Sequence, residues 1–516
     1  MAQIKALTLS AGLCASVALG APAFATDPLS AIEWLEKRPK QIIVPLETLN
    51  PPKIDEPAVA GSVVTPEVTV TPLGAPVRAA AGLLPSSVTG LPRELWRGSE
   101  TQDLTALLTA LNVENQPALQ SLFFTLLLAE SDPPQDARNA TFMRARIEKL
   151  LHLGALDPAQ ALLSRADPTH RDLFDLYFDV ALLSGDAEAP CASLRQTPAL
   201  SSDYARRIYC DALGQNWDNA ALTLATADAI GAIEARDVTL LERYLDPELF
   251  SDIPDAPQKP TPLQFRLFEA IGEPLPTASL PRTFSATELT GDAGWKSQLD
   301  AAERLARVGA ISENRLLGIY TSRIPSASGG IWDRVEALQR FDTAIVAGDP
   351  GAVTSALPAA WAAMEQAHLE VPFARLYATK LAKLPLSGSG GELAFKVAML
   401  SNDYETIAHS HIPQSKAETF LVSLASGTPD ASAATTPQAH AITTGFGKTS
   451  PPPELRLLLD KGQLGEVILK AMQLYESAAA GETKDIVAAL ATLRAVGLED
   501  TARQAALQLL LLRRGV

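Results

Sequence analysis

The sequence predicts an all-α protein in which antiparallel helix pairs stack in series as a solenoid. Apolar residues recur at helical spacing and would share one face of a helix at Leu119, Leu122, Phe123, Leu126 and Leu127. Aromatic residues make up only 6% of the chain, while Ala and Leu are abundant, which suits closely packed helices better than a sheet sandwich. A helix, turn and helix pattern also recurs along the chain.

The repeat is clearest in three successive stretches, residues 147–163, 177–194 and 208–224. Each stretch has an apolar helix that ends near a Gly, a short polar turn, and a second helix that opens on small residues. The three glycines are spaced by 31 and 29 residues, at Gly154, Gly185 and Gly214. We expect each of them to supply the left-handed conformation that ends a helix. Further turns of this kind occur near residues 348, 402 and 481.

In the third stretch, the residues Trp217, Ala220, Ala221 and Leu224 form one predicted stripe, with alanines small enough for a paired helix to approach. The segment "LGQNWDNAALTLA" resembles the tetratricopeptide repeat, and the spacing is close to the 34 residues typical of that family. The resemblance covers three units well and three more loosely. It implies helix pairs stacked in a superhelix with a concave surface for binding proteins.

Composition divides the chain into segments. Residues 39–92 contain ten prolines, so this part can neither run as a helix nor lie in the centre of a sheet. The predicted order is a signal peptide (1–25), a short amphipathic helix (26–38), a disordered Pro/Val/Thr-rich linker (39–98), a first helical-repeat block (99–250), a Pro-rich connection (251–292), a second helical-repeat block (293–425), a low-complexity loop (426–453) and a C-terminal helical repeat (454–516).

The N-terminal residues predict export. One basic residue, Lys5, precedes an apolar run that ends in a small-x-small pattern, so we expect cleavage between Ala25 and Thr26. No later apolar run is long enough to span a membrane. We therefore expect a periplasmic protein, or alternatively an extracellular one, with no integral membrane segment in the mature chain.

Only Cys191 and Cys210 remain after that cleavage. In an exported protein an isolated pair of this kind is best explained as a disulfide. Apolar residues outside the repeats are candidates for docking into a groove of a partner or of the chain's own repeats, namely Leu29, Ile32, Trp34, Leu35 and Trp96.

Several kinds of chemistry find no support in the residue patterns. The net charge of −16 argues against a nucleic-acid partner. "GFGKTSPPP" at 445–453 resembles the end of a phosphate-binding loop, but Ile442 stands where the first Gly is needed and prolines replace the following helix. His409 and His411 would lie on different sides of a helix, so they cannot share a metal ion. We expect no metal, no cofactor and no catalytic residues.

The sequence therefore predicts an exported, non-enzymatic helical-repeat scaffold or adaptor that binds protein partners in the cell envelope. Two alternatives remain open. One is an envelope hydrolase, acting on peptidoglycan, with an unrecognised site. The other is a structural subunit of an envelope or motility complex.

Overall fold

Helices form nearly all of the regular structure of this computed structural model, which describes residues 81–512 apart from 251, 291 and 480–482. Within these described residues there is no β-strand, and only one isolated bridge joins Leu84 to Ala129. The predicted all-α class is therefore confirmed. The predicted signal peptide, the 26–38 helix and residues 39–80 of the linker lie outside the described residues. A solenoid arrangement stays a prediction.

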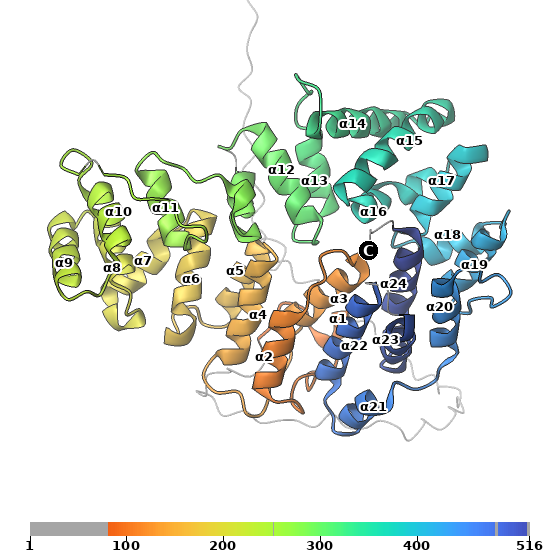
Figure 1. Cartoon of the computed structure of the whole chain (residues 1–516), viewed down its shortest axis with the longest axis horizontal. Coiled ribbons are helices and arrows are strands. Elements are labelled where there is room, and N and C mark those ends of the chain that lie inside the picture. Colours follow the sequence, from red (N-terminus) through yellow and green to blue (C-terminus); the bar gives the residue numbers. More distant parts are fainter. Residues whose placement is uncertain (1–80, 251, 291, 480–482, 513–516) are drawn as a thin grey trace, which may run out of the picture. The chain divides into compact units, whose positions relative to one another are not determined.

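The first half of the described chain contains α1 (Ser86–Thr89), α2 (Thr101–Ala110), α3 (Pro117–Leu128), α4 (Thr141–His152), α5 (Leu156–Arg165), α6 (Arg171–Ser184), α7 (Glu188–Gln196), α8 (Tyr204–Leu213), α9 (Trp217–Ala229), α10 (Ala235–Leu245) and α11 (Pro262–Ala270), shown from red to green in Figure 1. Short 3₁₀ segments are η1 (Pro198–Leu200), η2 (Thr277–Ser279) and η3 (Arg282–Thr290).

The second half contains α12 (Trp295–Ala306), α13 (Glu313–Tyr320), α14 (Ile331–Ala347), α15 (Pro350–Ala367), α16 (Glu370–Leu381), α17 (Gly388–Ala398), α18 (Tyr404–Ser410), α19 (Lys416–Ala425), α20 (Pro437–Gly447), α21 (Pro453–Asp460), α22 (Leu464–Ala479), α23 (Thr483–Ala495) and α24 (Glu499–Leu511). Across the part of the chain that the structure describes, every helix is too short or too polar to cross a membrane.

The three clearest repeats form the helix pairs α4 with α5, α6 with α7, and α8 with α9. Gly154 and Gly185 have φ angles of 79° and 80° and end the first helix of their pairs, as predicted. The expectation for Gly214 is wrong, because its φ is −80° and the left-handed residue is Gln215, with φ 62°. The third turn therefore places its strained residue one position later.

Residues 81–98 differ from the predicted disordered linker. Leu84 pairs with Ala129, Pro85 precedes α1, and Trp96 is only 1% exposed. The Trp96 ring contacts Phe142, with centroids 5.4 Å apart, and lies against Gly465. Apolar side chains between the prolines thus pack on the helices, and Trp96 belongs to the core of its own chain rather than to a surface for a partner.

Two other segments predicted as irregular also contain helices. The 251–292 connection includes α11, which begins with a capping box between Thr261 and Gln264. The 426–453 loop includes α20, which starts at Pro437 behind the cap Thr436. In both helices the proline stands in the first turn, where its missing N–H costs nothing, so proline content alone overestimated the irregular structure.

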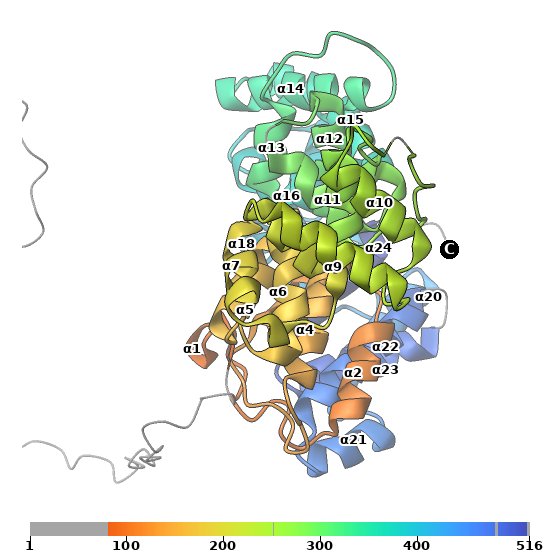
Figure 2. The same ribbon diagram turned by 90° about the vertical axis from the view of Figure 1, so that its left-hand side faces the viewer.

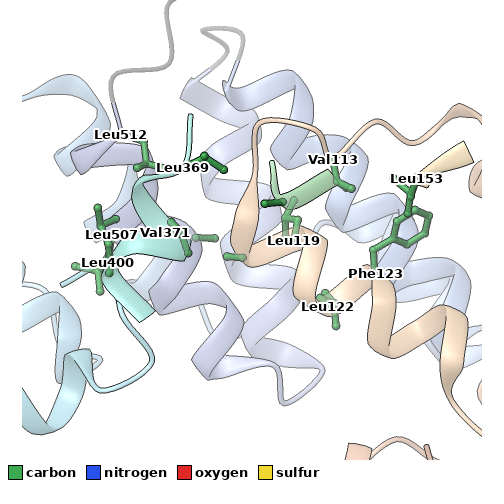
Figure 3. Packing of buried hydrophobic residues seen from close by; sticks show 14 of the residues in the cluster. Val113, Leu119, Leu122, Phe123, Leu153, Leu369, Val371, Leu400, Leu507 and Leu512 are labelled. Atoms are coloured by element: carbon green, nitrogen blue, oxygen red, sulfur yellow. The ribbon is translucent and has the colours of Figure 1, made fainter. Parts of the chain in front are cut away.

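The larger hydrophobic cluster runs from α2 to α24 and brings distant parts of the chain together. Helices α2 and α22 lie side by side in both Figure 1 and Figure 2, and α3 packs on α24. The Gln508 side chain accepts a hydrogen bond of 2.8 Å from the Ala118 N–H, and Leu95 O accepts one of 2.9 Å from the Gly465 N–H. Figure 3 shows part of this cluster, including Leu119 of α3, Val371 of α16 and Leu507 of α24.

A smaller hydrophobic cluster is formed by α6 to α11. Helix α6 borders both clusters, because Phe174, Phe178 and Leu182 face the smaller one while Leu173 and Val180 face the larger one. A helix that is apolar on two sides in this way is buried between two layers. The smaller cluster holds the candidate site described below.

A buried carboxylate joins three helices of the second half. Glu303 in α12 is 2% exposed. It accepts hydrogen bonds from Tyr320 Oη of α13 at 2.6 Å and from Arg334 Nε of α14 at 2.8 Å, and it pairs with Arg307 at 3.0 Å. Burial, together with the Glu303 charge, raises the pKa of Tyr320 well above its usual value. The network satisfies the polar atoms that α12, α13 and α14 bury.

Candidate functional site: a groove over helix α8

The candidate site lies where α7, α8 and α9 meet, and a disulfide joins α7 to α8. The sulfur atoms of Cys191 in α7 and Cys210 in α8 are 2.00 Å apart, and the two Cα atoms are 5.0 Å apart. Arg195 adds a second link, because its guanidinium donates to Cys210 O at 2.9 Å and to Glu188 at 3.1 Å. The predicted cysteine pair is thus at bonding distance and fixes α7 against α8.

Helix α8 is held from the other side by a cluster of charges. Arg206 forms ion pairs with Asp175 and Asp179 of α6, the latter at 3.1 Å, and lies 3.6 Å from Asp203. Burial raises the pKa of Asp179 to about 6, an effect that Arg206 opposes and the Asp175 charge reinforces. The same three carboxylates raise the pKa of Arg206 against the opposing effect of burial. One arginine therefore anchors α8 to α6.

Between α7 and α9 a cavity of about 530 Å³ opens over α8. This volume is within the range of ligand-binding sites. It is lined by residues of α7, η1, α8, α9 and their connections, namely Leu194, Arg195, Pro198, Tyr204, Arg207, Cys210, Asp211, Asn216, Asn219, Leu222, Thr223 and Thr226.

Helix α9 forms the open wall of this groove with Asn219, Leu222, Thr223 and Thr226. Its buried residues are Ala220, Leu224 and Ala227. Leu222 is 67% exposed and Trp217 is 48% exposed. The predicted stripe is therefore only half right, because Trp217 and Ala221 lie outside the buried face. Of the two exposed residues, only Leu222 lines the cavity.

Polar side chains line the floor and rim of the groove. Arg207 stacks 5.3 Å from the centre of the Tyr204 ring and donates to Pro198 O at 2.9 Å and Ser201 O at 2.6 Å. Asn219 Nδ2 donates to Asp211 Oδ2 at 2.6 Å. These contacts orient the Asn219 amide and the Arg207 guanidinium in the groove that Leu222 also lines.

This arrangement can bind a polypeptide segment. Apolar side chains of a bound segment would cover Leu222, and the Asn216 and Asn219 amides can pair with its backbone. Asp211 is the one carboxylate among the lining residues, and Asn219 already donates to it. General acid and base catalysis by paired carboxylates needs a second such group in reach.

The other residues singled out in the sequence lie elsewhere. Leu29, Ile32, Trp34 and Leu35, and the Ala25/Thr26 cleavage position, fall outside the described residues. His411 stacks on Phe395 with ring centroids 3.8 Å apart and contacts Glu418 at 2.8 Å. Residues 81–512, apart from the gaps named above, contain no group of three metal-ligating side chains.

The glycines of "GFGKTS" belong to the end of α20, and Gly445 is packed against Leu490 of α23. A methyl group at Gly445 would lie 3.2 Å from Leu490 Cβ, so this glycine allows two helices to approach closely. The segment forms a helix end in place of a loop that surrounds a phosphate.

Sequence reasoning missed Leu222 and Arg207. Leu222 is the one large apolar residue of α9 that does not fit the predicted stripe, and that misfit was the available signal. Arg207 lies three residues after Tyr204 on α8, so that contact is local, but the Pro198 and Ser201 carbonyls to which Arg207 donates are placed by the turn at η1.

Comparisons with known proteins add no relative to this description. The chain matches no protein-family model, and neither the curated proteins nor the solved structures contain a match to it.

Proposed function

We propose that this protein is an exported, non-enzymatic helical-repeat scaffold that binds a protein partner in the cell envelope through the groove over α8. The observation that carries the proposal is the exposed Leu222 side chain of α9 beside a cavity of about 530 Å³. The cysteine pair at bonding distance supports an oxidising compartment such as the periplasm. The resemblance to tetratricopeptide repeats, a family that binds proteins, points to the same kind of function.

The proposed ligand is a segment of a partner protein in extended conformation with a large apolar side chain. That side chain would lie over Leu222, which is 67% exposed in the absence of a partner. Burying such a side chain contributes roughly 1.5–3 kcal/mol, enough to dominate the affinity of a short segment. Asn216 and Asn219 would hold its backbone.

Photo-crosslinking tests this proposal in cells. In one variant a photoreactive residue replaces Thr226, which lines the groove and is exposed. In the control variant the same photoreactive residue replaces Gln102, which is exposed on α2. We expect a discrete adduct with another protein from position 226 only, and its loss when Leu222→Glu is added. Adducts of equal yield from both positions, or an adduct unchanged by Leu222→Glu, would contradict the proposed groove.

The crosslink also separates a partner from the chain itself. An intramolecular adduct between position 226 and residues 26–38 would mean that the predicted N-terminal helix occupies the groove. The hydrolase alternative is tested separately with a zymogram on purified cell wall. Clearing that disappears on a single carboxylate substitution would favour an enzyme.

A further inference from the structure

A second cavity, of about 380 Å³, lies between the end of α2, the end of α4, η3 and α12. Three cationic side chains, Lys149, Arg282 and Arg304, line it together with His152. Glu114 is the one carboxylate among its lining residues. With His152 neutral, the lining therefore carries a net charge of about +2 in a chain whose net charge is −16.

Two of the cations, Lys149 and Arg304, are held in place by neutral groups. Lys149 is 6% exposed and donates to Leu111 O at 2.8 Å and Thr109 O at 3.2 Å. Arg304 donates to Leu280 O at 2.6 Å and Thr277 O at 3.0 Å. Carbonyl oxygens orient these groups but do not neutralise them, so their charge remains available to a ligand in the cavity.

Arg282 is the third cation, and it is paired with a carboxylate. Its Nη2 donates to Glu114 at 2.6 Å, and the Glu114 side chain is 46% exposed. Its Nε is buried without a hydrogen-bond partner. This Nε is closed to the cavity, so any contact with a ligand there would come from the other nitrogens of the guanidinium.

The electrostatics of the cavity agree with this geometry. Burial lowers the pKa of Lys149, against the opposing effect of Glu476, and lowers the pKa of Arg304, with Arg282 adding to the effect. Burial, Lys149 and Arg282 together lower the pKa of His152, against the opposing effect of Glu114. Positive charge in this cavity is thus unfavourable until an anion joins it.

We propose that this cavity is a binding site for a small dianion, a phosphate monoester or a dicarboxylate. A dianion matches the net charge of the lining. The Arg282 guanidinium would pair with it, and Arg304 and Lys149 would attract it. The proposal does not depend on the groove over α8, because no lining residue is shared between the two cavities.

Calorimetric titration of the full chain tests the site with three probes: sulfate, inorganic phosphate and malonate. Sulfate keeps two charges across the pH range used, so it separates titration of the protein from titration of the ligand. We expect one saturable site. A preference for phosphate over malonate would identify phosphate monoesters as the natural class, and the reverse preference would identify dicarboxylates. Absence of saturation by all three probes up to about 10 mM would overturn the proposal.

Matched variants locate the binding. Arg282→Gln should raise the Kd for sulfate at least tenfold, as should Lys149→Met. Arg266→Gln is the control, because Arg266 also donates to carbonyl oxygens, Leu182 O at 2.8 Å and Leu183 O at 3.1 Å, but lies outside the cavity. Equal weakening by Arg266→Gln would indicate general attraction of anions and overturn the site. If Lys149→Met does not fold, Arg282→Gln alone decides.

The His152 side chain offers a direct reading of the cavity. Its NMR titration, assigned with His152→Asn, should show a higher pKa when sulfate is bound, because the anion offsets Lys149, Arg282 and Arg304. Binding of sulfate should correspondingly weaken as pH rises through that pKa. Saturation by sulfate without any change in the His152 titration would place the anion elsewhere and refute the assignment.

Discussion

The two hydrophobic clusters of this protein are held together in different ways. In the larger cluster, residues far apart in the sequence complete each other's environment, as where Gln508 caps α3 at Ala118, 390 residues away. In the smaller cluster, α6 to α11 pack mainly on one another, and α6 also contacts α4, α5 and η3. A disulfide between residues 19 positions apart joins α7 to α8.

Because of this difference, we expect the two regions to unfold in different ways. Helix pairs that contact only near neighbours gain stability locally, so one end can open without the other. Contacts between distant segments couple the opening of those segments. In the smaller cluster, the disulfide joins α7 to α8 and the ion pairs of Arg206 join α8 to α6. Four predictions test this comparison.

The largest effect is expected from Glu303→Ala. This change leaves Arg334, Arg307 and Tyr320 without their shared partner in a buried place, and breaking such a network costs about 3–5 kcal/mol. Urea unfolding measures the loss. As a control, Glu148→Ala removes an exposed i,i+4 pair with Arg144 and should cost about 0.5 kcal/mol or less. Similar losses in the two variants would mean that the buried network is not what joins these helices.

Removal of the disulfide by the double change Cys191→Ala and Cys210→Ala should cost roughly 3 kcal/mol, because the cross-link limits the unfolded chain. The comparison predicts that the loss stays local. In hydrogen exchange, protection should fall in α7 to α10 while α3 and α24 keep theirs. A uniform loss across both clusters would show that the two regions unfold as one.

Gly465→Ala should cost about 2 kcal/mol by overpacking. A Cβ there would lie 2.3 Å from the Trp96 ring, where α22 meets the segment before α2. Exchange protection should fall at both places, although the change affects only one residue. Gly318→Ala, in α13 with open space around it, is the control and should be neutral or stabilising.

The smallest effect concerns pH. Asp179 has a pKa of about 6 in the fold against 3.8 when unperturbed, so the folded state favours its protonated form. Its contribution to stability is complete below pH 3.8 and is lost as pH rises through about 6. Asp179→Asn should therefore be more stable than the parent by about 1 kcal/mol at pH 8 and equal to it near pH 4.

Thermal unfolding at the two pH values measures the Asp179 effect. Asp175→Asn is the matched control, because Asp175 also pairs with Arg206 but its side chain is 44% exposed, against 21% for Asp179. A gain at pH 8 in both variants would mean that excess acidic charge, and not the burial of Asp179, limits stability there.

Local patterns in the sequence predicted the helices well, and with them the turns at Gly154 and Gly185. Those features depend on residues a few positions apart. The proline-rich segments were predicted as irregular, but Pro262 and Pro437 stand in the first turns of helices α11 and α20. Trp96 is buried because Phe142 of α4 and Gly465 of α22 lie beside it, and no local pattern contains that information.

The two cavities illustrate the same limit. Leu222 could have been noticed as an apolar residue off the helical stripe. The cationic cavity could not, since Lys149, Arg282 and Arg304 come from three elements that only the tertiary fold brings together. Sequence separations of this size carry no periodic signal.

The contact between Leu95 and Gly465 has a consequence for how the chain matures. A ribosome makes the first helices long before α22 and α24, so α2 and α3 wait, incompletely covered, while most of the protein is still being synthesised. For the export proposed above, such a delay would keep the nascent chain loosely folded and able to pass through a narrow translocation channel before α22 and α24 complete the fold.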